Sequence, residues 1–274
     1  KQKTAYEIKE CDWSSDVCSS DLNLPLDLAH PWQYHSLQPM AAEDNMGHRS
    51  VLSALCLLAF AVLPRVALAQ PISPQAQERW YQGFRVWVDC ERRGPVLFNY
   101  TAHRDSGSLG REGGYRLDPD FDPECQSKSN RPFGTSRGVP YDVGHQVPVN
   151  HMDGSARAVV QVNYWTNLLP QTSSMNRGAW RQTEDIIECV RDQTPLEVWG
   201  GAIWTNAKSN FVRSHGMQTP SAYWKVAIRT DNRDAMAWII PNGKAPRGAL
   251  NRYIRSEEHT SELQSHSFIS YAVF

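Results

Sequence analysis

A single segment of this chain combines a helix start with helical spacing, and this limits the fold more than any other feature. The segment at 174–191 begins beside Ser173 and Ser174, either of which can accept hydrogen bonds from the unpaired N–H groups of a first turn. Ile187 and Val190 supply apolar positions for packing. We therefore predict one well-marked helix in the middle of the chain.

The remaining apolar runs are short and rich in β-branched and aromatic residues, which is typical of strands. The clearest are FRVWVDC, PVLFNYTAH, LEVWGGAIW, SAYWKVAIR and AMAWIIP, and VVQVNYWTNLLP also reads as extended. A polar stretch at 104–140 reads as a long functional or disordered loop. The order favours an α+β fold with a mixed or antiparallel sheet core over alternating βαβ units.

Both ends carry sequences that do not look native. The segments DWSSDVCSSDL at 12–22 and RSEEHTSELQS at 255–265 can be encoded by the two complementary strands of one DNA. No property of a folded protein would require its two ends to be complementary in this way. The string resembles a sequencing adapter. We therefore expect 1–45 to be adapter-derived and upstream translation, and 255–274 to be an adapter-derived tail that replaces the native C-terminal end.

A secretory signal peptide is predicted at 46–69. Met46 is followed by a basic residue, an apolar run and the small-residue pattern ALA. Pro64 and Arg65 shorten the apolar run below the roughly 18 residues that a membrane span needs, which disfavours a transmembrane helix. We expect a secreted or periplasmic protein with a single domain at 70–254 and no stable membrane association after signal cleavage.

The predicted domain is mildly basic. Residues 70–254 contain 22 Lys and Arg against 18 Asp and Glu, a formal charge of +4, and 18 of those 22 are Arg. Arginine presents a planar fork of donors that matches phosphate oxygens, although +4 alone is ordinary for a domain. Cys90, Cys125 and Cys189 fall in this part, and an exported protein can join two of them, but their spacing does not indicate which.

The polar positions of the helix raise the question of a metal. Asn176, Trp180 and Glu184 are four residues apart, so they share one face of the predicted helix. Such an Asn and Glu could hold one hydrated cation, or they could simply be solvated. Upstream, His145 offers a general base, because histidine titrates near neutrality, whereas a lone histidine is more often structural. A one-metal phosphodiesterase needs a general base, an oxygen ligand for a hard cation and a carboxylate that holds the metal waters. His145, Asn176 and Glu184 could supply these three groups.

The ordered motifs resemble a known family. The stretch DVGH at 142–145, the NLLPQ at 167–171 and the NRGAWRQTE at 176–184 are similar to the Asp-Arg-Gly-His, Asn-x-x-Pro-Gln and Asn-x-Gly-x-Trp-x-x-x-Glu signature of the DNA/RNA non-specific endonuclease family. This family belongs to the ββα-metal (His-Me finger) superfamily. GYRLDP at 114–119 resembles its upstream arginine segment. The match extends over nearly all of 87–242, and it implies a ββα-metal finger, a hairpin plus helix, that carries the active site.

The resemblance also implies a role for each matching residue. His145 would be the general base, and Asn176 the only direct protein ligand of Mg²⁺, or of Mn²⁺ in its place. Glu184 would hold metal waters, and Asp142 would orient them and the nearby site. Arg116 would contact the phosphate, while Asn167 and Gln171 would position the hairpin or the phosphate. The implied activity is Mg²⁺-dependent hydrolysis of DNA and RNA with little sequence specificity, leaving 5′-phosphate products.

Val143 departs from the pattern, because the family has arginine at this position. Residues i and i+2 of an extended segment point the same way, so that arginine would lie near His145. We expect reduced rather than abolished activity, and an increased rate in Val143→Arg. The alternative is a catalytically impaired homologue that only binds nucleic acid. Retention of His145, Asn176 and Glu184 argues against it, since binding alone needs none of them.

The other histidines are expected to be structural. His151, with Asp153 as its partner, has no Asn and Glu to complete a site, and His103 and His215 lie outside the motifs. The tryptophans are expected to fill the core rather than to stack on bases, although stacking stays open for an exposed one.

Overall fold

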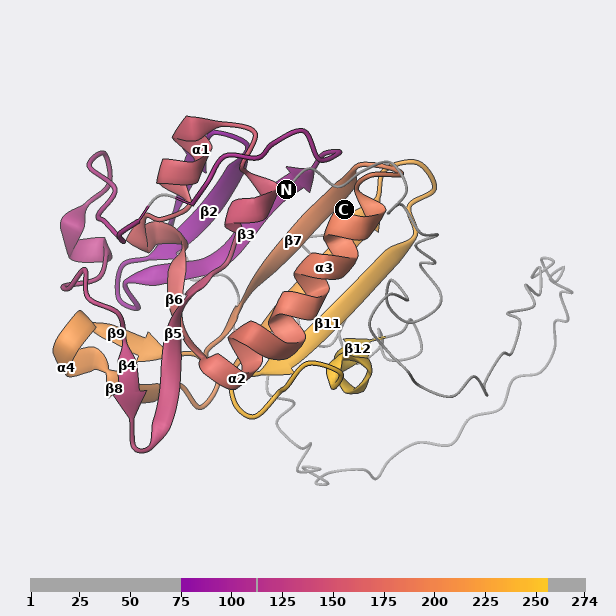
Figure 1. Ribbon diagram of the computed structural model, residues 1–274. Helices are drawn as coiled ribbons and strands as arrows, with labels where there is room; N and C mark the ends of the chain where they lie inside the picture. The colour runs from indigo at the N-terminus through magenta and orange to yellow at the C-terminus, as the bar shows by residue number, and fades with distance from the viewer. Residues whose placement is uncertain (1–74, 112, 256–274) are drawn as a thin grey trace, which may run out of the picture. The chain divides into compact units, whose positions relative to one another are not determined.

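Seven antiparallel strands form the main sheet, with the order β1-β2-β3-β7-β10-β11-β12 (Figure 1). The computed structural model describes residues 75–111 and 113–255. The strands are β1 (Ala76–Tyr81), β2 (Phe84–Asp89), β3 (Gly94–Ala102), β7 (Leu196–Ile203), β10 (Ala222–Arg229), β11 (Ala235–Pro241) and β12 (Ile254–Arg255). The five clearest strand predictions are confirmed, and the sequence reasoning missed β1 and β12.

A smaller sheet carries the segment with the histidine and aspartate motif. It pairs β4 (Gly134–Ser136), β5 (Val139–His145) and β6 (Leu168–Thr172) in antiparallel order. A two-stranded sheet of β8 (Lys208–Phe211) and β9 (Met217–Thr219) encloses the short helix α4 (Val212–His215). Together with the main sheet and few helices, these elements confirm the predicted α+β class with antiparallel sheets.

The predicted central helix is present but interrupted. It consists of α2 (Ser173–Met175), a π-helical turn at Asn176–Trp180 and α3 (Arg181–Val190). Gly178 breaks the helical conformation with φ −102° and ψ −114°. A Cβ at Gly178 would clash with the backbone at 245–247, and the next residue, Ala179, donates its N–H to the Ala245 carbonyl at 3.0 Å. The close approach of the C-terminal segment therefore requires glycine here.

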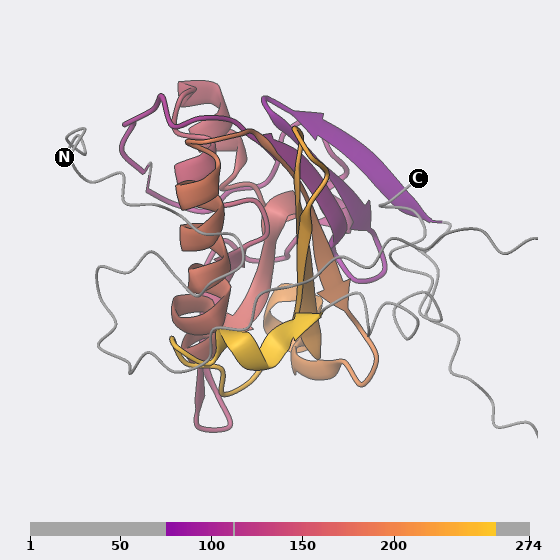
Figure 2. The ribbon, with the colours of Figure 1, turned by 90° about the vertical axis from the view of Figure 1, so that its right-hand side faces the viewer.

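The helix α3 lies across one face of the main sheet (Figure 2). Ile187 and Val190 of α3, with Trp180 directly before it, are fully buried in one apolar cluster with Phe98 and Tyr223 of the sheet. Burying each such side chain stabilises the fold by about 1.5–3 kcal/mol. This packing fixes the helix relative to the strands before any polar contact is considered.

Two local predictions were wrong. The run VVQVNYWTNLLP was expected to be extended, but its first part belongs to α1 (Ala156–Gln161), whose start is capped by Ser155 Oγ accepting from the Ala158 N–H at 3.4 Å. The side-chain cap overrides the strand propensity of the valines. The central helix begins after Thr172, not Ser173 or Ser174, and Thr172 makes no side-chain cap hydrogen bond.

The long polar stretch is structured. It contains a 3₁₀ turn at Pro123–Cys125 as well as β4, and a disulfide joins Cys90 to Cys125. Asp118 is buried within it and accepts hydrogen bonds from Arg79 and from the Tyr81 hydroxyl, at 2.9 and 2.7 Å. A buried carboxylate needs such partners, which the composition of the stretch could not indicate.

The predicted signal peptide and both predicted adapter segments fall outside the described residues, apart from Arg255 at the end of β12. Within 75–111 and 113–255, no helix combines the length and the apolarity needed to cross a membrane.

Candidate active site

The hairpin-plus-helix unit is formed by β5, β6 and the helix that follows β6 directly. In the antiparallel register Asp142 lies opposite Gln171, and His145 lies opposite Leu168. The first turns of the helix therefore pass beside Asp142. This arrangement confirms the fold expected of a ββα finger.

Asp142 is the centre of a hydrogen-bond cluster at the start of the helix. Its carboxylate accepts from Ser173 Oγ at 2.9 Å, from Asn176 Nδ2 at 3.0 Å and from two nitrogens of Arg177 at 2.8 and 2.7 Å. Burial acts to raise the pKa of this carboxyl, but the donated hydrogen bonds and the Arg177 charge outweigh it, so the pKa is lowered. Asp142 is thus held as a carboxylate that fixes the helix start.

The contact with Asp142 orients the Asn176 amide. Because Nδ2 donates to Asp142, Oδ1 is left as an acceptor, and it accepts no hydrogen bond from any described residue. A neutral amide oxygen beside a carboxylate suits a hard cation that keeps most of its waters, as Mg²⁺ does. No three His, Cys, Asp or Glu side chains of the described residues gather into a metal site. The Asn176 oxygen is therefore a possible ligand for such a cation by its chemistry alone.

His145 is held in one tautomer by a residue that the sequence reasoning missed. The Asn163 amide nitrogen donates to the Val159 carbonyl at 3.0 Å, so its Oδ1 faces His145 Nε2, also at 3.0 Å. An amide oxygen only accepts, so Nε2 carries the proton and Nδ1 keeps a free lone pair. Trp180 of the helix also donates Nε1–H to the His145 carbonyl at 3.3 Å. The ring is therefore arranged to accept a proton at Nδ1.

Burial lowers the pKa of His145 to about 4, with Arg111 adding to the shift and the Asn163 hydrogen bond opposing it. The ring is only half-buried, so solvent moderates this effect. Its direction nevertheless leaves the imidazole neutral at pH 7, as a general base requires. Arg111 lies at an exposed position near the base and is a further cation that the motifs did not reveal.

Asn167 and Gln171 are buried supports rather than exposed contacts. Asn167 accepts from the Val147 N–H at 2.9 Å and donates to the Val147 and Val162 carbonyls, so it clamps the chain that follows His145. Gln171 lies over Gly144, where any Cβ would collide with it. Both amides are fully buried. Of the two roles expected for them, positioning the hairpin is the one that their burial supports.

Arg116 lies beside the residue that holds the base. Its N–H donates to the Asn163 carbonyl at 3.2 Å, and its carbonyl accepts from the Trp165 N–H at 3.0 Å. Its guanidinium is half-buried and donates to the Gly113 carbonyl at 3.4 Å. The backbone bridge thus brings Arg116 to the neighbourhood of His145.

Glu184 does not contact Asp142 or Asn176 directly. It is nearly buried and pairs with Arg181 at 3.4 Å. Burial raises its pKa, and the charges of Lys225 and Arg181 oppose that shift. Glu184 lies on the buried side of α3, four residues after Trp180. This position agrees with a role in supporting the site.

A fully buried lysine of the central strand β10 was not anticipated. Lys225 Nζ donates to Thr183 Oγ1 at 2.8 Å and lies 3.8 Å from the Trp180 ring centre. Burial lowers its pKa to about 8, and Glu184 opposes the shift. From sequence alone, a lysine within a strand is predicted to be exposed. Only the packing of the helix against β10 shows that Lys225 is buried.

His151 is not held by Asp153 as expected. Its Nδ1 is 2.7 Å from the Tyr100 hydroxyl, and its side chain is fully buried under α3. His215 is also buried, with hydrogen bonds to the Arg131 carbonyl and Ser214. Neither ring lies with Asp142 and Asn176, which agrees with structural roles.

Known proteins match this chain over the region that contains these motifs. The family model described as DNA/RNA non-specific endonuclease matches residues 65–270. The chain belongs to this family. The endonuclease family match covers most of the chain and all of the elements that build the hairpin-plus-helix unit.

Individual relatives are more distant. A nuclease of Serratia marcescens is 27% identical over 161 residues, which are 55% of this chain and 58% of that protein. The mitochondrial nuclease 1 of Schizosaccharomyces pombe is 32% identical over 115 residues, 41% of this chain and 35% of that protein. The matched part thus spans between about a third and three fifths of these relatives. A crystal structure of the EndoG/EndoGI complex shares the fold, with TM-score 0.53 and 15% identity over 68% of this chain and 82% of that chain.

Val143 lies in the apolar core and is only 5% exposed. The departure from the family arginine therefore fills an apolar position, and Arg177 supplies an arginine to Asp142 from the helix instead. Val143→Arg remains expected to raise the turnover of the folded protein, because a phosphate-binding fork near His145 would be restored. Specific activity and thermal unfolding are measured together, since an arginine in the core also costs stability. An equal or lower turnover would show that the site is rebuilt around valine.

The lowered histidine pKa values predict a pH-dependent stability. Burial lowers the pKa of the buried His151 well below 6.5 and that of the half-buried His145 to about 4, so the unfolded chain binds more protons than the folded one below pH 6.5. Stability is present above pH 6.5 and falls as the pH drops, by about 1.4 kcal/mol per pH unit for His151 and by less for the solvent-screened His145. Urea unfolding at a series of pH values measures this slope. His151→Gln should flatten it, and an unchanged slope in that variant contradicts the prediction.

Proposed function

We propose that the protein is a secreted, Mg²⁺-dependent endonuclease that hydrolyses phosphodiester bonds of DNA and RNA with little sequence specificity. The observation that carries the proposal is that hydrogen bonds orient a base and a cation ligand on one hairpin-plus-helix unit. Asn163 leaves His145 Nδ1 free to accept a proton, and Asp142 accepts from the Asn176 amide nitrogen, which leaves the Asn176 oxygen as an acceptor. Family membership supports nucleic acid as the substrate.

In the proposed reaction, His145 Nδ1 removes a proton from water as the water oxygen bonds to phosphorus and the bond to the 3′ oxygen breaks. The leaving 3′ oxygen takes a proton from solvent, and the imidazolium of His145 returns its proton to solvent. The products are a 5′-phosphate and a 3′-hydroxyl. Mg²⁺ bound at Asn176 would supply electrostatic stabilisation of the charge on the phosphate and leaving oxygen. Asn163 keeps the imidazole in the required tautomer, and Arg116 and Arg111 are placed to neutralise phosphate oxygens.

The proposed location outside the cytoplasm rests on the predicted signal peptide at 46–69, with Mn²⁺ as an alternative metal in vitro. The Cys90–Cys125 disulfide supports it, because disulfides persist in oxidising compartments. The runner-up is a homologue that binds nucleic acid without cleaving it.

The test incubates the folded protein with supercoiled plasmid and, separately, with structured RNA, with Mg²⁺, with Mn²⁺ and with excess chelator. We expect cleavage of both nucleic acids with either metal and none with chelator. End-labelling of the products would show 5′-phosphates. Binding to both nucleic acids without any metal-dependent cleavage would favour the runner-up.

A further inference from the structure

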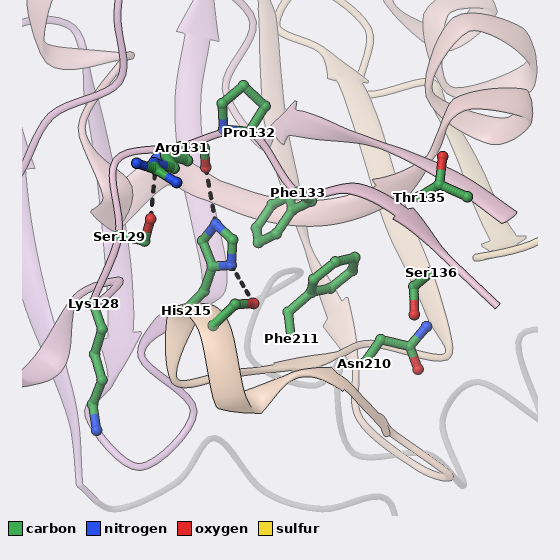
Figure 3. A pocket seen from close by; sticks show the side chains of 11 residues that line it. Lys128, Ser129, Arg131, Pro132, Phe133, Thr135, Ser136, Asn210, Phe211 and His215 are labelled. Carbon is green, nitrogen blue, oxygen red and sulfur yellow. Dashed lines mark hydrogen bonds between the residues drawn. The ribbon is translucent and has the colours of Figure 1, made fainter. Parts of the chain in front are cut away.

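A pocket of about 580 Å³ lies between β4 with its preceding loop and the β8–α4 segment (Figure 3). The rings of Phe133 and Phe211 are buried at its centre, with centroids 4.7 Å apart. Around them stand polar groups of Ser129, Thr135, Ser136, Asn210 and Ser214. None of the residues proposed for the reaction lines this pocket.

The segments that form the pocket are strongly basic. Residues 126–141 and 204–219 contain no Asp or Glu, and they contain the five cations Lys128, Arg131, Arg137, Lys208 and Arg213. All five are exposed, and none pairs with an acidic group of the described residues. Elsewhere most arginines of the described domain are ion-paired, so this concentration of unneutralised charge favours the approach of an anion.

The basic loop at the pocket is held in place from beneath. The Lys128 N–H donates to the His215 carbonyl at 2.9 Å, and the His215 Nε2–H donates to the Arg131 carbonyl, also at 2.9 Å. The Ser214 hydroxyl, 2.8 Å from His215 Nδ1, can then donate to that nitrogen. One buried histidine thus fixes both cation-bearing residues, which lowers the entropy lost when an anion binds.

A continuous row of rings links the pocket to the proposed base. The Tyr115 ring lies 6.3 Å from His145 and 5.8 Å from Trp165, and Trp165 lies 5.6 Å from Phe133 in the pocket. These contacts belong to one packed unit that holds the two regions at a fixed separation. Because only three ring-to-ring steps of 5.6–6.3 Å join His145 to Phe133, the two regions lie no further apart than a strand of a few nucleotides can span.

We propose that this pocket binds a backbone phosphate of the substrate strand, a few nucleotides away from the bond that is cleaved. The proposal rests on the proposed nuclease function and names a second contact for its substrate. Lys and Arg charges with hydroxyl and amide donors suit phosphate oxygens. The central rings are too buried to stack on bases, so the contact carries no sequence preference, in agreement with a non-specific enzyme.

The test measures binding and cleavage separately. The double variant Lys128→Gln/Arg131→Gln is compared with Arg157→Gln/Arg252→Gln, which removes the same charge from exposed positions elsewhere. A fluorescein-labelled single-stranded DNA of about 12 nucleotides is titrated by anisotropy in excess chelator, over about 50–200 mM salt. Turnover is measured on the same DNA and on a dinucleotide, which is too short to reach the pocket.

For the pocket variant we expect about tenfold weaker binding and a salt slope reduced by about 0.7, since one single-strand phosphate contact is lost. Turnover of the dinucleotide stays at the wild-type value. The same loss in the control pair, or no loss in the pocket variant, overturns the proposal. If the wild type binds the DNA and the pocket variant does not, yet neither cleaves it with any metal, the nuclease function fails while the phosphate site stands.

Discussion

His145→Ala lowers metal-dependent cleavage of plasmid and RNA by about 10²- to 10⁴-fold, the range that a positioned general base contributes. The loss follows from the geometry of the ring. Asn163 Oδ1 accepts a hydrogen bond from Nε2–H, so Nδ1 is the ring nitrogen that can receive a proton from water. The measurement is the initial rate of nicking at saturating Mg²⁺, with circular dichroism to show that the variant is folded.

The matched control is His103→Ala, which removes an exposed histidine outside the motifs and leaves the rate unchanged. Added imidazole should restore part of the activity of His145→Ala, because a small base can enter the space left by the ring. Asn163→Ala should retain more activity than His145→Ala, since it releases the tautomer without removing the base. Undiminished cleavage in His145→Ala would exclude this residue as the base.

Asn176→Ala weakens metal binding and lowers the rate by about 10²-fold or more, since losses of this size follow removal of a preorganised polar group at a reacting centre. Its Oδ1 is the acceptor that remains when Nδ2 donates to Asp142. Calorimetric titration with Mn²⁺ in the His145→Ala background reports binding independently of turnover. The affinity should drop when Asn176→Ala is added to that background.

Two neighbouring variants separate ligation from support. Arg177→Ala removes an exposed partner of Asp142 but keeps the Asn176 amide, so we expect a smaller effect on Mn²⁺ affinity. Asn176→Asp keeps an oxygen ligand but places a second carboxylate against Asp142, which should raise the pKa of the pair. Equal Mn²⁺ affinity in Asn176→Ala and the parent would remove Asn176 from the metal site.

The sequence predicted five strands of the main sheet and the central helix, because strand composition and helical spacing are local properties. It also placed Asp142 and Asn176 on the right elements, and the structure brings them into contact. It did not predict Asn163 beside His145, since that contact depends on where α1 ends. Lys225 was also missed, because a lysine within a strand run gives no sign of burial.

The wrong expectation for His151 has a long-range cause. Asp153 follows His151 closely in sequence and seemed its natural partner, but the ring points into the core and meets Tyr100 from β3. The error arises because long-range packing overrides spacing along the chain.

The glycine in the π-helical turn bears on how this unit could be transplanted or shortened. The backbone at 245–247 lies against Gly178, and the Ala245 carbonyl receives the N–H of Ala179, within the turn that contains Asn176. The hairpin and helix are close in sequence, but the turn that contains Asn176 is packed against a segment more than sixty residues downstream. The hairpin and helix are therefore not a self-sufficient unit. Grafted alone onto another scaffold, they would lack the backbone segment that holds the turn of the proposed metal ligand.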